Sequence, residues 1–154
     1  IFREKPKQLN IQKAAIEKYN LSIREIVQLK NGENITRENG TTILYKDCTL
    51  APENPRAYAY CSDTLYKEDI IPQLTNIDLL YHEATYMNDL AARAKETFHT
   101  TALQAATIAK MADVKKLVIG HFSARYKSSK ELVEEARSIF PETYAAEDGL
   151  SFEI

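Results

Sequence analysis

Cysteine is scarce in this chain, which has only Cys48 and Cys61 among its 154 residues. Neither their number nor their spacing suits a zinc finger or a scaffold held together by disulfides. We therefore expect idle thiols in a reducing, cytoplasmic environment, with Cys61 serving as a small apolar residue of a strand. Apolar runs also stay well short of the roughly 20 residues that a membrane-spanning helix needs, so no membrane partner is expected.

Net charge is small as well. A value of −2 argues against a protein that binds nucleic acid over its whole surface. The charges are nevertheless unevenly distributed: residues 1–30 have seven basic and three acidic residues, residues 113–130 have five and one, and residues 47–90 have two and eight. Two basic stretches thus flank an acidic middle. They are either contacts for a phosphate backbone or ordinary solvated faces, and charge alone does not separate the two.

The hydrophobic and turn patterns predict an α/β protein with one sizeable core. From residue 57 onward we expect strands at 57–61, 77–81 and 117–120 and helices at 67–74, 88–97, 101–112 and 128–140. Before them we expect helices at 11–19, capped by Asn10, and from Ser22 to about residue 31, then a hairpin turn at 38–40. The remaining extended segments are expected at 144–145 and 150–154. Because the first residue is Ile1 rather than Met, we expect a piece of a longer protein.

The three histidines of the chain, His82, His99 and His121, all lie where a predicted strand ends or a predicted helix begins. Asp63 likewise follows a predicted strand. Open α/β sheets place their functional residues on the loops after the carboxyl ends of strands. The pattern therefore predicts part of a hydrolytic metal site.

Asp63 and His121 are the candidate metal ligands. A carboxylate after a strand, with Ser62 and Thr64 to hydrogen-bond it, suits zinc or a harder cation, and an imidazole after Gly120 suits zinc. Each has an ordinary alternative. The Ser-Asp-Thr run could cap the helix expected at 67–74, and His121 could be a hydrogen-bonded core histidine.

Glu83 and His99 form a second candidate pair, with a different chemistry. A carboxylate that orients an imidazole fixes its tautomer and raises its basicity, so that the imidazolium can donate a proton to a leaving alkoxide. The alternative is a structural hydrogen bond joining two loops. His82 should point to the opposite side of its strand from Glu83 and is interpreted as structural or supporting.

Arg125 and Tyr126 follow His121 closely. A guanidinium beside a metal suits a phosphodiester oxygen, and a tyrosine ring can stack on a base. Arg125 could instead pair with an acid of the last helix.

Several of these segments resemble motifs of one family. They are Ser62-Asp63-Thr64, His82-Glu83-Ala84-Thr85, His99-Thr100-Thr101 with Gln104-Ala105-Ala106, Gly120–Tyr126, and the opening Glu4-Lys5-Pro6-Lys7. Together they resemble the C-terminal half of the ribonuclease Z family, tRNA 3′-processing endonucleases of the metallo-β-lactamase superfamily. The resemblance implies a C-terminal half of an αββα sandwich over residues 1–154, with residues 1–32 as a basic, helical, arm-like region.

The resemblance also implies roles for individual residues. Asp63 would bridge a pair of zinc ions, His121 would bind one of them, and His99, braced by Glu83, would protonate the leaving 3′-oxygen after attack by metal-activated hydroxide. The implied substrate is precursor tRNA and the implied assembly is a homodimer. The RNA-binding residues that the resemblance implies are Lys5, Lys7, Thr85, Thr100, Ser123, Arg125 and Tyr126.

The chain departs from the family pattern in two places. The histidine-rich His-x-His-x-Asp-His loop is absent, and three histidines cannot supply a dinuclear site. Residues 20–25 also stand where many relatives have an arm rich in glycine and proline. We therefore expect this polypeptide to be inactive alone. Half of a sandwich should leave an apolar sheet face uncovered, which predicts pairing with a complementary segment or self-association.

Three other interpretations remain open at this point. The chain could belong to another metallo-β-lactamase-fold hydrolase that acts on small phosphodiesters or sulfate esters. It could be a non-catalytic fragment that binds RNA through its basic residues. It could also be a plain α/β domain whose histidines fall together by coincidence.

Overall fold

The computed structural model describes residues 1–154, and the chain divides into two compact units. The larger unit contains Ile1–Glu4 and Arg56–Ile154, and the smaller contains Lys5–Pro55. The basic region predicted at 1–32 therefore begins in the larger unit and continues in the smaller one. None of the helices combines the length and the hydropathy that crossing a bilayer would require.

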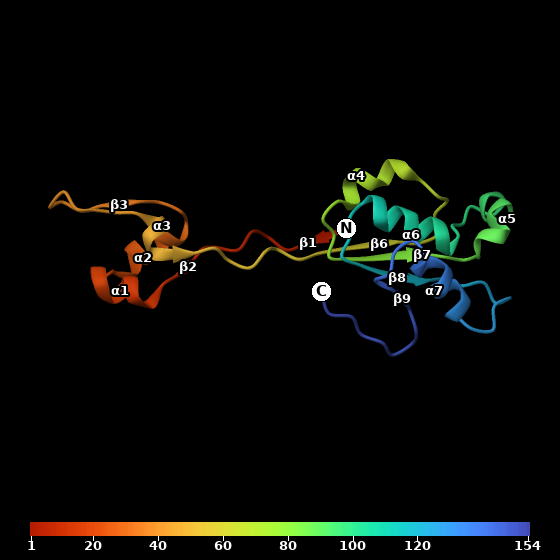
Figure 1. The fold of residues 1–154 in the computed structure, drawn as a ribbon. Coiled ribbons are helices and arrows are strands. Elements are labelled where there is room, and N and C mark those ends of the chain that lie inside the picture. The colour runs from red at the N-terminus through yellow and green to blue at the C-terminus, as the bar shows by residue number, and fades with distance from the viewer. The chain divides into compact units, whose positions relative to one another are not determined.

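The larger unit is built on a five-stranded sheet (Figure 1). Its strands, in spatial order, are β1 (Phe2–Arg3), β6 (Ala57–Cys61), β7 (Leu79–Glu83), β8 (Lys116–Gly120) and β9 (Thr143–Ala145). The last four run parallel, whereas β1 is antiparallel to β6. Parallel strands bring their carboxyl ends to the same edge of a sheet, and β6, β7 and β8 are the strands that the candidate residues follow.

Helices alternate with these strands, as the sequence predicts. They are η1 (Glu68–Ile70), α4 (Ile71–Leu74), η2 (Asn88–Leu90), α5 (Ala91–Glu96), α6 (Ala102–Met111) and α7 (Lys130–Arg137). Thr101 and Gln104 form the predicted capping box at the start of α6. Ala105, Ala106 and Ala109 of this helix are fully buried. Their small size lets α6 lie close to the sheet, where it packs against β7 and β8.

The two faces of the sheet have different side chains. Ala59, Leu80 and Ile119 lie in the core that α4, α6 and α7 cover. Because side chains alternate along a strand, their neighbours lie on the opposite face. There the rings of Tyr60 and Tyr81 stack with centroids 4.5 Å apart, and Tyr60 is 56% exposed. This aromatic face, with helices on the other side only, is what half of an αββα sandwich should show.

The smaller unit has a core of its own, formed by Ala15, Leu21, Leu29, Ile35, Ile43 and Cys48. Its helices are α1 (Lys13–Tyr19), α2 (Ile23–Lys30) and α3 (Tyr45–Cys48). Its strands pair as β2 (Asn10–Ile11) with β5 (Thr49–Leu50) and as β3 (Ile35–Thr36) with β4 (Thr42–Ile43). The second pair is the predicted hairpin, and Ser22 with Glu25 forms the predicted capping box of α2.

Some predicted element ends are wrong, and tertiary contacts explain them. Asn10 does not cap α1, because it pairs with Leu50 in a strand, and Gln12 precedes the helix instead. The strand predicted at 77–81 lies two residues later, at Leu79–Glu83, and the Asp78 carboxylate just before it accepts the Ala57 N–H.

Helix α7 ends at Arg137 rather than near the predicted residue 140. The Ser128 hydroxyl accepts the Lys130 N–H at 3.1 Å, as predicted for the cap of this helix, whereas Ser129 makes no such hydrogen bond. The helices expected at 67–74 and 88–97 each begin with a 3₁₀ turn. Residues 150–154 form no strand; Leu150, Phe152 and Ile154 line a cavity on the aromatic face of the sheet with Tyr58 and Tyr81.

Candidate metal and proton-transfer site

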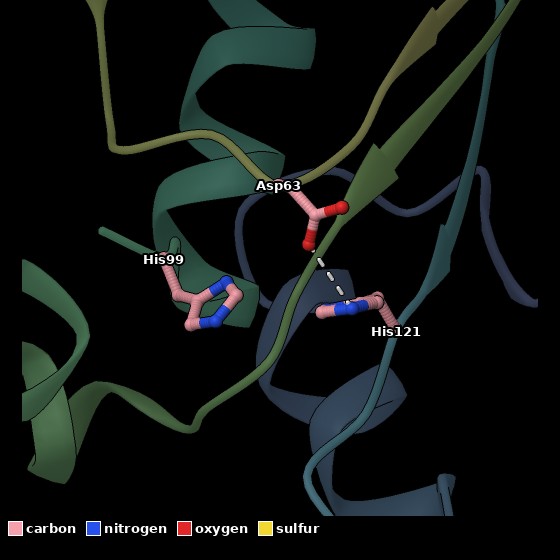
Figure 2. A group of neighbouring side chains, drawn as sticks. All are labelled: Asp63, His99 and His121. Atoms are coloured by element: carbon pink, nitrogen blue, oxygen red, sulfur yellow. Dashed lines mark ion pairs between the residues drawn. The ribbon is translucent and has the colours of Figure 1, made fainter. Parts of the chain in front are cut away.

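Three residues from separate segments meet at the carboxyl edge of the sheet. Asp63 follows β6, His121 follows β8, and His99 lies two residues before Thr101, the cap of α6. One ligand atom of each lies within 4.8 Å of the others. Figure 2 shows the three side chains pointing toward one another. The sequence predicted Asp63 and His121 as a pair; the tertiary structure adds His99 to the cluster.

Asp63 and His121 are in direct contact. The Nε2 atom of His121 lies 3.2 Å from Oδ1 of Asp63, and their side chains are 41% and 72% exposed (Figure 2). Both residues have left-handed backbone conformations, with φ of 47° for Asp63 and 61° for His121. Residues other than glycine rarely adopt this region, and the surrounding fold must hold them there. The two ordinary alternatives for these residues are wrong. Asp63 does not cap a helix, because η1 begins at Glu68 after Lys67, and His121 is not a core histidine, because it is exposed.

Glu83 is the buried centre of the hydrogen bonds beneath this cluster. Its side chain is fully buried and accepts the N–H groups of Thr64, at 2.8 Å, and Thr100, at 3.2 Å. It also accepts the Thr85 hydroxyl at 2.7 Å, and its Oε1 lies 2.9 Å from Nδ1 of His99. Burial by itself raises the pKa of Glu83, but these hydrogen bonds from Thr85, His99, Thr100 and Thr64 outweigh it and lower that pKa.

Thr64, Thr85 and Thr100 have supporting positions in this arrangement. Thr85 Oγ1 lies 2.9 Å from Nδ1 of His121, so it links that ring to Glu83. Thr85 and Thr100 are 5% and 0% exposed, which places these predicted RNA contacts beneath the site. Thr64 was predicted to hydrogen-bond Asp63, but its N–H donates to Glu83 instead. Spacing in the sequence gave no signal for these links, which cross between strands.

His99 is held by the end of helix α5. The N–H of His99 donates to the Ala94 carbonyl at 2.8 Å, and the N–H of Phe98 donates to Lys95 at 3.3 Å. This is the Schellman pattern, whose central position usually has glycine because its backbone is left-handed. Here that position is Phe98, with φ of 60° and 71% of its side chain exposed.

Replacing Phe98 with glycine is expected to raise the free energy of unfolding by about 0.5–1 kcal/mol. The left-handed conformation costs a residue with a Cβ about 1–2 kcal/mol in the folded state, and glycine avoids this cost. Glycine also makes the unfolded chain more flexible, which offsets part of the gain. Urea unfolding measures the change. Phe98→Ala is the matched control, because it removes the exposed ring and keeps the Cβ. Equal stabilities of the two variants would show that the backbone at Phe98 is not strained.

His82 lies under the site and is fully buried. Its Nδ1 lies 2.7 Å from the carbonyl oxygen of Glu83, and its Nε2 has no hydrogen-bond partner. Because that carbonyl can only accept, Nδ1 bears the proton of a neutral ring. Burial lowers the pKa of His82, which keeps the ring neutral. His82 thus fits its predicted supporting role.

The segment after His121 places the other predicted RNA contacts. Arg125 is exposed, donates to Ser123 Oγ at 3.2 Å, and has its guanidinium 5.0 Å from the ring centre of Tyr86. It stacks there rather than pairing with an acid of α7. The Tyr126 hydroxyl accepts the Met87 N–H at 2.9 Å, and its ring packs against the core.

The predicted lysines of the basic region lie in the smaller unit. Lys5 is exposed, and Lys7 lies 3.4 Å from the carboxylate of Glu53. Tyr86 was not predicted as a site residue. Its ring supports Arg125 and lies 6.2 Å from the ring of His99, edge to face.

A parallel sheet that is covered by helices on one face, with carboxylate and imidazole groups at its carboxyl edge, defines half of a metallo-β-lactamase-fold protein. A solved structure supports this class. The metallo-β-lactamase fold protein YhfI from Bacillus subtilis is similar with a TM-score of 0.58 and 24% identity, over 79% of this chain and 48% of that one. No protein-family model matches the chain.

Within this class, the sequence is similar to ribonuclease Z. The ribonuclease Z of Phocaeicola vulgatus is 46% identical over 154 residues, which are 100% of this chain and 50% of that protein. That of Cytophaga hutchinsonii is 44% identical over 155 residues, 100% of this chain and 49% of that protein. The chain spans about half the length of these curated relatives. The predicted resemblance to the C-terminal half of ribonuclease Z is confirmed.

Proposed function

We propose that this chain is the half of a zinc-dependent endoribonuclease that carries the proton donor and part of the metal site, and that the enzyme removes the 3′ trailer from precursor tRNA. The observation that carries the proposal is the Glu83–His99 pair, 2.9 Å apart, beside the Asp63–His121 contact. The similarity to ribonuclease Z supports the choice of substrate. A coincidental cluster would not have one buried carboxylate oriented toward an imidazole at the metal-type site.

The donor set fits a metal ion by its chemistry. An exposed carboxylate and an imidazole already lie 3.2 Å apart, and their donor types suit zinc and, with less preference, manganese or iron. Asp63 and His121 would hold the ion. When bound, zinc supplies a Lewis acid that activates water near neutral pH. The similarity to ribonuclease Z supports a metal ion at this site.

Proton donation falls to His99. Since the ionised Glu83 carboxylate can only accept, the Nδ1 of His99 bears a proton, and its Nε2 is the atom available to the substrate. His99 would donate its Nε2 proton to the leaving 3′-oxygen of the RNA, while Glu83 holds the ring in orientation.

Contacts with RNA would come from exposed cations. The Arg125 guanidinium, which stacks on Tyr86, is suited to a phosphodiester oxygen beside the site. Lys5 and Lys7 would meet the tRNA backbone, which predicts binding that weakens as salt rises. We further propose a homodimer that acts in the cytoplasm.

The test supplies the complementary half from a relative. The chain would be co-purified with the part of Phocaeicola vulgatus ribonuclease Z that it does not match, and assayed on precursor tRNA with added zinc. We expect cleavage by the pair and none by the chain alone, since three histidines cannot complete a dinuclear site. Asp63→Ala in the assembled pair should abolish cleavage.

Two outcomes would change the conclusion. Equal turnover of bis(p-nitrophenyl) phosphate with no preference for tRNA would favour a phosphodiesterase that acts on small esters. RNA binding by the chain that is unaffected by Asp63→Ala, with no cleavage in any assembly, would favour a non-catalytic RNA-binding domain.

A further inference from the structure

We propose that the isolated chain holds one divalent transition-metal ion with Asp63, His99 and His121 as its protein ligands. The new element is His99, whose role as proton donor under the proposed function is distinct from a ligand role. The inference rests on the geometry of this chain and requires neither RNA nor a second half.

The distances suit a single ion. Ligand atoms bound to one zinc at about 2.0–2.2 Å lie about 3.3–3.6 Å from each other in a tetrahedral arrangement. Asp63 Oδ1 and His121 Nε2 are already 3.2 Å apart, and the ligand atoms of all three residues lie within 4.8 Å of one another. The rings of His99 and His121 are tilted by 39° with centroids 5.2 Å apart. The three side chains point toward one another, so a short closing movement would bring their ligand atoms to these separations (Figure 2).

Hydrogen bonds to Nδ1 leave Nε2 as the nitrogen that each imidazole can offer to an ion, and both lead back to Glu83. It accepts the Nδ1 proton of His99 directly, at 2.9 Å. It also accepts the Thr85 hydroxyl at 2.7 Å, which leaves Thr85 Oγ1 to accept the Nδ1 proton of His121 at 2.9 Å. An ion at the cluster would bind each ring through Nε2, and it would take the place of the present His121 Nε2 contact with Asp63. Histidines that bind a metal usually donate their other ring N–H to a carboxylate or another acceptor, as these two do directly or through Thr85.

The cluster is open enough for an ion to enter and for water to complete the coordination. The side chains of Asp63, His121 and His99 are 72%, 41% and 21% exposed. The carboxylates of Asp63 and Glu83 give the site negative charge, whereas the nearby Arg125 is stacked on Tyr86. Two imidazoles and one carboxylate with an open position suit zinc, iron(II) or cobalt(II).

The role of His99 follows from its surroundings. In the isolated chain His99 Nε2 is the third protein donor beside Asp63 and His121, and metal coordination there occupies the atom that would otherwise give up a proton. Under the proposed function, ligands from the complementary half would take the place of His99 and return it to proton donation. This second step depends on the proposed function, whereas the metal site does not.

The test is metal binding by the purified chain. Equilibrium dialysis against zinc with elemental analysis should give about one ion per chain, and cobalt(II) should give the visible absorption of a four-coordinate site with nitrogen and oxygen ligands. His99→Ala, Asp63→Ala and His121→Ala should each lose the ion, and Glu83→Gln should weaken binding about 10–100-fold. Asp69→Asn, an exposed acid on η1, should bind as the wild type does.

Circular dichroism and thermal unfolding would check that each variant is folded, and Phe98→Gly offers a change beside His99 that keeps every ligand. Retention of the ion with an unchanged cobalt spectrum in folded His99→Ala would overturn the proposal, as would the absence of binding by the wild-type chain. These readouts are separate from RNA cleavage. A chain that binds metal through His99 while the assembled pair fails to cleave tRNA would uphold this inference and reject the proposed function.

Discussion

Replacing Glu83 with alanine is expected to lower the free energy of unfolding by about 3–5 kcal/mol, the usual cost of removing one partner from a buried charged network. The fully buried carboxylate accepts the N–H groups of Thr64 and Thr100 and the hydroxyl of Thr85. Alanine would leave these donors without an acceptor. Urea unfolding followed by circular dichroism should show a lower midpoint with an unchanged slope.

The pH dependence of this stabilisation has a defined sign. The pKa of Glu83 is lowered in the folded state from its ordinary value of about 4.5. Its contribution to stability is therefore fully present above that pH and is lost as the pH falls toward the folded-state pKa. The difference in unfolding free energy between wild type and Glu83→Gln should shrink on acidification. A difference that stays constant with pH would argue against charge as the cause.

Replacing His99 with alanine in the assembled pair is expected to reduce kcat for precursor tRNA by about 10²–10⁴-fold, the usual contribution of a positioned general acid. KM should change little, because the predicted RNA contacts lie elsewhere. Zinc content of the pair should also be unchanged, in contrast to its loss from the isolated His99→Ala chain. Single-turnover kinetics with parallel elemental analysis measure both quantities.

The matched control for this experiment is Tyr86→Phe, which keeps the ring that lies edge to face with His99. It should retain nearly full turnover. A decrease in kcat of less than about 10-fold in His99→Ala would show that another group, or water, donates the proton to the leaving oxygen. A loss of zinc from the assembled pair in step with activity would instead show that His99 remains a ligand in the complete enzyme.

Local patterns predicted much of the fold. The strand at Ala57–Cys61 has the predicted ends, and the capping boxes of Ser22 with Glu25 and Thr101 with Gln104 are present. These features depend on neighbours within a few residues, so the sequence specifies them directly. The errors arose where a distant contact intervened, as at Asn10, whose strand partner Leu50 is far away in the sequence. Rules based on helix caps and hydrophobic periodicity use only nearby residues, so they do not include such distant partners.

The candidate site divides in the same way. The sequence by itself determined which residues have the chemistry, because Asp63, Glu83, His99 and His121 follow strands or precede a capped helix. Only the tertiary structure decided how they are connected, because parallel pairing of β6, β7 and β8 brings three loops to one edge. That pairing makes Glu83 the shared support of both imidazoles and draws His99 into reach of Asp63 and His121. Links across strands depend on register and on side-chain direction, neither of which a linear pattern contains.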